Sequence, residues 1–176
     1  MKSSALKWEL IGIAVISVLG SVLHFAFDWS GEWPPVGVIA AVNESVFEHL
    51  KLTFWPTVFY AAITYRLLKN TTNNFMVAKA AAVYVMPIAI IVFFYAYTTI
   101  TGTENLIVDI VIFIVAVALG QLASYRILTI SRLPSSFSWL ALTFLIILAV
   151  IYGLFTFYTP HVPFFMDAES GIYGIP

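Results

Sequence analysis

The segment from Asn43 to Lys51 carries the side chains best suited to chemistry, because two carboxylates, an imidazole and an ammonium precede a long apolar run. They belong to Glu44, Glu48, His49 and Lys51. An ionisable side chain at the centre of a bilayer costs about 2.5–3.5 kcal/mol on insertion scales, so such groups face protein, water, an ion or one another. The segment therefore predicts a polar centre at one end of an apolar bundle.

Two other segments carry polar side chains that a helical fold would bring to the same end. Ser17, Ser21, His24 and Asp28 are spaced by four, three and four residues, which places them along one side of a helix. His161 follows a later apolar run and stands close to two prolines. Three separate segments thus deliver histidines and carboxylates to one membrane face.

These residue types predict a zinc site. Imidazole and carboxylate are usual zinc ligands, and a catalytic site uses three of them and leaves a fourth position for water. The predicted ligands are His24, His49, His161 and Asp28. In this hypothesis Glu48 or Glu44 takes a proton from the bound water, and Ser21 or Lys51 stabilises the developing negative charge.

The same residues have simpler interpretations that the sequence leaves open. Ser45 and Glu48 have the spacing of a capping box, in which each side chain bonds the backbone of the other at a helix start. Lys51 would then only neutralise Glu48 one helical turn away. His161 would only anchor the tail.

Membrane helices are the elements that must position these residues. Of the 176 residues, 61% are hydrophobic and 10% are charged, against roughly 25% charged in an ordinary soluble domain. We therefore expect an integral membrane protein that forms a single domain over residues 1–176. A net charge of −1 without a basic run argues against nucleic acid as a partner and leaves membrane lipids as the expected partners. The absence of cysteine excludes disulfides and thiol catalysis.

Apolar runs and turn residues predict an all-α fold, a polytopic membrane helix bundle with five transmembrane helices. The spans cover about residues 8–27, 45–68, 75–97, 106–127 and 137–158. The apolar run 36–42 is too short to cross a bilayer and predicts a re-entrant or interfacial segment. Residues 159–176 form a tail whose many apolar side chains predict that it folds back over the polar centre.

The distribution of Lys and Arg predicts the orientation, because these residues collect on the cytoplasmic side of membrane proteins. With five spans, seven of the eight Lys and Arg fall on the side of the N-terminus, and Lys51 is the exception. The chain is therefore expected in the cell membrane with its N-terminus inside and its tail outside. The polar centre then faces outward.

Two resemblances extend this interpretation. The motif Asn43-Glu-Ser-Val-Phe-Glu-His-Leu-Lys51, with His24 and the tail from His161, resembles an uncharacterised family of small polytopic prokaryotic membrane proteins. That resemblance spans nearly the whole chain and implies a polytopic fold without implying a reaction. A fainter one is to intramembrane zinc hydrolases of the alkaline ceramidase type, which assemble a Ser, an Asp and three His. Ser21, His24 and Asp28 match their first members, whereas the paired His-x-x-x-His of the last helix and two of the seven spans are missing.

Three functional hypotheses follow from these observations. The first is a metal-dependent hydrolase that acts on a lipid or on a substrate at the membrane surface. The second is a proton- or cation-coupled transporter or small channel, which would need a polar route to the inner face. Beyond Ser17, Gln121 and Ser124, the inner halves of the spans offer few polar side chains for such a route. The third is a structural or assembly protein whose polar cluster only locks the bundle.

Overall fold

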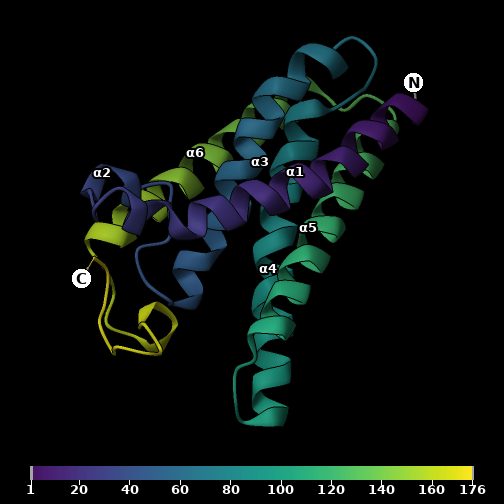
Figure 1. Cartoon of the computed structure of the whole chain (residues 1–176). Helices are drawn as coiled ribbons and strands as arrows, with labels where there is room; N and C mark the ends of the chain where they lie inside the picture. The colour runs from purple at the N-terminus through teal and green to yellow at the C-terminus, as the bar shows by residue number, and fades with distance from the viewer. Residues whose placement is uncertain (1, 176) are drawn as a thin grey trace.

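The computed structural model describes residues 2–175. This part of the chain forms five long helices and one short one, joined by turns and followed by a tail (Figure 1). The long helices are α1 (Lys2–Trp29), α3 (Val46–Leu68), α4 (Phe75–Thr101), α5 (Leu106–Thr129) and α6 (Ser135–Phe157). The short helix α2 (Pro34–Gly37) precedes α3, and a single 3-10 turn, η1 (Pro163–Phe165), lies in the tail. The prediction of an all-helical bundle is confirmed. Helices α1 and α4 are longer than predicted, and α6 begins two residues earlier than expected.

Local sequence signals explain where the helices begin and end. Ser45 caps α3, since its hydroxyl accepts a hydrogen bond from the backbone N–H of Glu48 at 3.3 Å. Asn105 caps α5 by accepting bonds from the N–H groups of Ile107 and Val108. Gly102, with φ of +74°, ends α4 and lets the chain reverse into α5, because a left-handed conformation costs glycine little.

Four of the long helices are long and apolar enough to cross a membrane: α1, α4, α5 and α6. Helix α3 is less apolar than these four helices because it carries charged, hydroxyl and aromatic side chains. Twelve of its 23 residues are buried inside the protein, where it packs against α1 and α4. The polar residues Glu48, Lys51, Thr53 and Thr57 are among those buried, whereas the exposed side of the second half of α3 carries Phe59, Ile63 and Leu67. The polarity of α3 therefore lies mainly inside the bundle.

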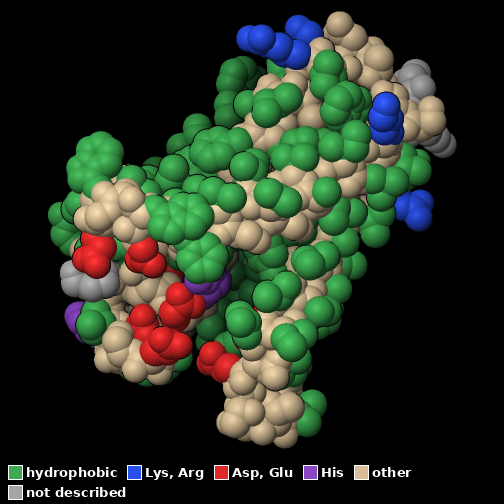
Figure 2. All heavy atoms as spheres, viewed as in Figure 1, with side chains coloured by type: hydrophobic (Ala, Val, Ile, Leu, Met, Phe, Trp, Pro, Cys, Tyr) green, Lys and Arg blue, Asp and Glu red, His purple; other side chains and the backbone are tan. Residues whose placement is uncertain are grey.

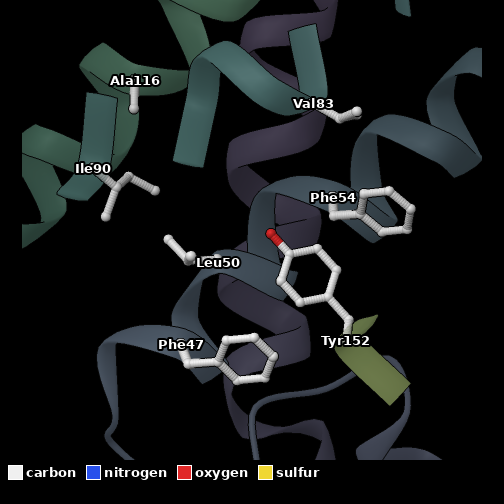
Figure 3. Close-up of a cluster of buried hydrophobic side chains, with 7 residues drawn as sticks. All are labelled: Phe47, Leu50, Phe54, Val83, Ile90, Ala116 and Tyr152. Carbon is white, nitrogen blue, oxygen red and sulfur yellow. The ribbon is translucent and has the colours of Figure 1, made fainter. Parts of the chain in front are cut away.

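A hydrophobic cluster fixes the rotation of α3. Figure 3 shows Phe47, Leu50 and Phe54 on one side of this helix, with Tyr152 of α6 reaching between the two phenylalanines. The ring centroids lie 5.5 Å apart for Phe47 and Tyr152 and 5.3 Å apart for Phe54 and Tyr152. Val83 and Ile90 of α4 and Ala116 of α5 complete the cluster. Because this apolar side faces α4 and α6, the neighbouring residue His49 is turned toward α1.

Charged side chains gather at opposite ends of the molecule. Figure 2 shows Lys and Arg near the N-terminus and Asp, Glu and His toward the tail. The end that carries the tail also holds α2 and the turn that follows it, which packs Ala40 and Val42 against Phe27 of α1. The segment 36–42 thus begins in α2 and continues as a turn whose residues Ala40, Ala41 and Val42 are buried, and its predicted re-entrant or interfacial placement stays a prediction.

Candidate metal centre

Two histidines and a glutamate converge at the tail end of the bundle. The Nε2 atoms of His24 on α1 and His49 on α3 lie 3.1 Å apart. One carboxylate oxygen of Glu44, in the turn before α3, lies 3.5 Å from the first and 3.3 Å from the second. Within the described residues these three form the group able to hold a metal ion. The sequence predicts that His24, His49 and Glu48 share one cluster, and His24 and His49 do meet, whereas the Glu48 carboxylate bonds Lys51, Val42 and Thr156.

The spacing of the three ligand atoms matches a tetrahedral zinc site. Zn–N bonds of about 2.0–2.1 Å at tetrahedral angles separate neighbouring ligand atoms by about 3.3–3.4 Å. The three observed separations, from 3.1 to 3.5 Å, bracket this value. His24, His49 and Glu44 would therefore hold a zinc ion through three ligands, and a zinc ion with three protein ligands can also bind water or substrate.

The backbone of α3 orients His49 for binding through Nε2. Its Nδ1 lies 2.9 Å from the carbonyl oxygen of Ser45, and because a carbonyl only accepts, Nδ1 carries the proton. Histidine ligands of metals commonly donate their other N–H in this way. With a metal ion bound, Nε2 would give its lone pair to the ion, whereas without an ion a protonated ring donates from Nε2 to Glu44.

The tail holds Glu44 in place. The backbone N–H of Glu44 donates to a carboxylate oxygen of Asp167 at 3.1 Å, and the side-chain amide of Asn43 donates to the carbonyl of Gly174 at 2.8 Å. Phe165 stacks on Phe47 with ring centroids 4.5 Å apart. The prediction that the tail folds back over the polar centre is confirmed.

Electrostatics favour a charged Glu44 carboxylate. Hydrogen bonds from His24 and then His49 hold the pKa of Glu44 well below its usual range, against an opposing effect of partial burial. Burial also opposes ionisation of Asp167, but the backbone N–H groups of Ser170, Glu44 and Glu169 outweigh it and lower the pKa of Asp167. A carboxylate with so low a pKa is a good ligand and a poor proton acceptor.

A cavity of about 310 Å³ opens beside the three ligand residues, and its wall includes acidic residues that the sequence prediction did not assign to the site. They are Glu104 in the α4–α5 turn, Asp109 on α5 and Glu169 in the tail. Asp109 accepts a hydrogen bond of 2.6 Å from the hydroxyl of Tyr97. Burial and then the Asp109 carboxylate raise the pKa of Glu104. The one sequence signal for Asp109 is a carboxylate inside an apolar run.

The structure does not bring three other predicted residues into the metal group. Asp28 is exposed at the end of α1. His161 packs on the ring of Tyr173 with centroids 4.7 Å apart and lines a different cavity, near Thr159. Ser21 donates to the backbone carbonyl of Ser17 at 3.0 Å and lines a second cavity that also touches His24 and His49.

Glu48 and Lys51, predicted as catalytic, form a separate buried ion pair. Both side chains are at most 2% exposed. The ammonium also donates to the carbonyl of Gly37 at 2.7 Å and to the hydroxyl of Thr156 at 2.8 Å. The carboxylate accepts from the N–H of Val42 at 3.0 Å and from the same hydroxyl at 3.1 Å. These bonds connect α3 to the α2 turn and to α6, which favours a structural role for the pair. The capping box is present only in part, because the Glu48 carboxylate bonds Val42 and the N–H of Ser45 bonds Asn43.

A second buried polar cluster lies toward the N-terminal end of the bundle. The ammonium of Lys79 on α4 donates to Glu9 on α1 and to the hydroxyl of Ser124 on α5. Gln121 donates to the backbone carbonyl of Glu9 at 3.2 Å. The sequence prediction had noted Gln121 and Ser124 but had assigned no partner to Glu9.

Comparison with known proteins gives one match. Residues 1–175 match a family described as "Family of unknown function (DUF6512)", so the match covers nearly the whole chain. Among curated proteins and solved structures, nothing matches. The prediction of an uncharacterised family is confirmed. The likeness to hydrolases of the alkaline ceramidase type finds no support in these comparisons and stays a prediction.

Proposed function

We propose that this chain, which belongs to the family of unknown function DUF6512, is a zinc-dependent hydrolase embedded in the membrane. The observation that carries the proposal is the triangle of His24, His49 and Glu44 ligand atoms, with sides of 3.1 to 3.5 Å, beside an acid-lined cavity. Zinc held by two imidazoles and a carboxylate, with an open position, is a catalytic arrangement. Bound zinc supplies a water whose pKa is near 7.

Glu44 and Glu104 have different roles in the proposed reaction. Glu44 stays charged and serves as a ligand. Glu104 lines the same cavity, and partial burial and then the Asp109 carboxylate raise its pKa above the usual range, which favours it over Glu44 as the general base. When bound, zinc would supply the nucleophilic water for hydrolysis of an acyl bond. Glu104 would take the proton of that water as its oxygen bonds the acyl carbon, and would return the proton to the leaving oxygen or nitrogen as that atom's bond to the acyl carbon breaks.

The membrane placement that we propose has five spans, with α3 as the fifth, the N-terminus inside and the tail outside. The segregation of Lys and Arg at the N-terminal end supports it (Figure 2). Single cysteines at Ser3, Asn73 and Ser170 can be labelled on intact cells with an impermeant thiol reagent. We expect labelling at position 170 alone, and labelling at 73 but not at 170 would overturn the orientation.

Hydrolysis in detergent micelles tests the proposed reaction. The purified protein is incubated with butyryl and palmitoyl esters of 4-nitrophenol, and release of nitrophenol is followed before and after chelation and zinc addition. We expect release that chelation abolishes and zinc restores. His49→Ala should lose it, Glu104→Gln should lose it while keeping zinc, and His161→Ala should keep it. Release that is insensitive to chelation, or no release from a zinc-loaded protein with either ester, would refute the hydrolase.

A second candidate, proton transfer through the bundle, is favoured by one observation. In the described residues, four buried side-chain atoms lack a hydrogen-bond partner: Glu9 Oε2, Ser17 Oγ, His24 Nδ1 and Gln121 Oε1. Three lie on α1, and the fourth lies on α5 against it. Unpaired buried polar atoms are costly, and internal waters commonly satisfy them.

The buried Glu48–Lys51 pair and the buried cluster of Glu9, Lys79 and Ser124 would be the two ends of such a water route. An apolar cluster that includes Ile16 and Val117 also contacts this part of α1, which argues against an open channel. Reconstitution in vesicles with a pH-sensitive dye tests the candidate. Proton flux that Glu9→Gln abolishes would support transfer, and flux equal to that of empty vesicles would refute it.

A further inference from the structure

A second cavity continues from the metal centre into the lipid-facing side of the bundle. It has a volume of about 260 Å³ and lies between α1 and α5, with Leu52 of α3 at its base. It shares His24, His49 and Asp109 with the acid-lined cavity. In Figure 2 a hollow separates the acidic end from the α4–α5 hairpin, and histidine atoms lie at its edge. The two cavities therefore meet at the ligand residues.

The remaining wall of this second cavity is mostly apolar, and its polar members are Ser17, Ser21, His24, His49 and Asp109. Its flanks are Val18 on α1 and Ile110 and Ile114 on α5, which are 63%, 50% and 44% exposed. Both helices are long and apolar enough to cross a membrane, so these exposed side chains face lipid tails. From Ser17 to His24 the groove follows α1 for roughly 10 Å, at 1.5 Å per residue. An acyl chain could enter sideways from the bilayer without leaving an apolar surrounding.

The polar end of the groove restricts the head of such a molecule. Glu44, Glu104, Asp109 and Glu169 line the first cavity, and its lining includes no Lys or Arg. These carboxylates outweigh the charge of one divalent ion. An anionic head, such as a phosphate monoester, would be repelled, whereas a neutral or cationic head meets no like charge.

We infer that the site of His24, Glu44 and His49 takes an acyl lipid with a neutral or cationic head, whose chain lies in the groove between α1 and α5. This inference rests on the proposed hydrolase and names its substrate class. The groove adds little affinity of its own, because a lipid tail is as apolar in the bilayer as it is in the groove. It positions the chain, and the head at the metal centre decides binding. Hydrolysis then cleaves the acyl bond next to the chain.

Photocrosslinking tests where the chain lies. The probes are three monoacyl lipids with a diazirine in mid-chain: an acylglycerol, an acylcholine and an acylglycerol phosphate. They are incorporated with the purified protein in micelles, activated by light and mapped by peptide mass spectrometry. We expect the first two to label residues 17–24 of α1 and 106–114 of α5, and the anionic probe to label them at least tenfold less.

A matched pair of variants tests the groove itself. Ile114→Trp should fill it and reduce labelling by the acylcholine at least fivefold. Ile146→Trp on α6, where the native side chain is 56% exposed and lies outside the groove, should leave labelling unchanged. Equal zinc content in both variants shows that the fold is intact.

The outcomes separate this inference from the proposed function. Labelling spread evenly over all lipid-facing helices and insensitive to Ile114→Trp would overturn the groove, even if zinc-dependent cleavage of the butyryl ester persists. Equal labelling by the anionic probe would overturn the head specificity. Groove labelling without any zinc-dependent cleavage would leave a lipid-binding site and would refute the hydrolase.

Discussion

Replacing Lys51 by Met should strongly destabilise the protein, because it leaves the Glu48 carboxylate buried without its counter-ion. Only the N–H of Val42 and the hydroxyl of Thr156 would remain to stabilise that charge. Breaking a buried ion pair by removing one partner costs about 3–5 kcal/mol. For a chain of this length, that loss lowers the melting temperature by roughly 6–20 °C. Thermal unfolding in detergent, followed by circular dichroism, measures the shift.

The double variant Glu48→Gln with Lys51→Met is the control. It removes both charges and keeps an amide that can bond Val42 and Thr156, so its stability should return to within about 1–2 kcal/mol of the wild type. Both variants should keep their zinc. A Lys51→Met protein with wild-type stability and no hydrolysis would contradict this reasoning and restore the catalytic role for Lys51. If the double variant is as unstable as Lys51→Met, the loss of stability does not come from an unpaired Glu48 charge, and the explanation by the ion pair is wrong.

Three further outcomes follow from the site geometry. Ser45→Ala should lower the free energy of unfolding by about 1 kcal/mol through the lost helix cap, measured by urea titration, and should keep zinc because His49 bonds the backbone carbonyl of residue 45. Asp167→Asn weakens the bond that positions Glu44 and should reduce zinc affinity about 10- to 100-fold in a chelator competition. Acidification should release zinc, because protons compete with the ion for its ligands. The pKa of Glu44 is lowered from 4.5, so its charge is complete above pH 4.5 and is lost only as the pH falls below that value. Zinc should therefore begin to leave above pH 4.5, while Glu44 is still charged. Release of zinc that occurs only below pH 4.5 would contradict the role of the two histidines as ligands.

The helical fold was predictable because its signals are local. The Ser45 cap gave the start of α3 to within one residue, and the apolar runs located the other long helices, although α1 begins six residues earlier than predicted. The row Ser17, Ser21, His24 and Asp28 lies beside the buried side of α1 and not on it, because Glu9, Gly12, Ile16, Gly20 and Phe27 are buried whereas Ser21 and Asp28 are exposed. The predicted side of α1 was therefore wrong by about a quarter turn, and within that row His24 alone reaches His49.

The roles of the carboxylates were not predictable from local sequence. Glu44 lies in a turn whose shape depends on contacts with Asp167 and Gly174, more than 120 residues away in the chain. Glu48 and His49 are neighbours in sequence, yet the packing of Phe47 rotates α3 so that one side chain is buried and the other faces α1. Glu104 and Asp109 reach the cavity only because the long α4–α5 hairpin turns beside it, and the sequence has no signal for that placement.

Metal content tests the central claim most directly. The protein is purified in detergent without added chelator, dialysed against micromolar zinc and then against zinc-free buffer, and measured by plasma mass spectrometry. We expect about one zinc per chain in the wild type and in His161→Ala, and less than a tenth of that in His24→Ala and His49→Ala. The histidine at position 161 is the matched control because it lies outside the group. Equal zinc in all four proteins, or none in the wild type, would contradict the metal centre.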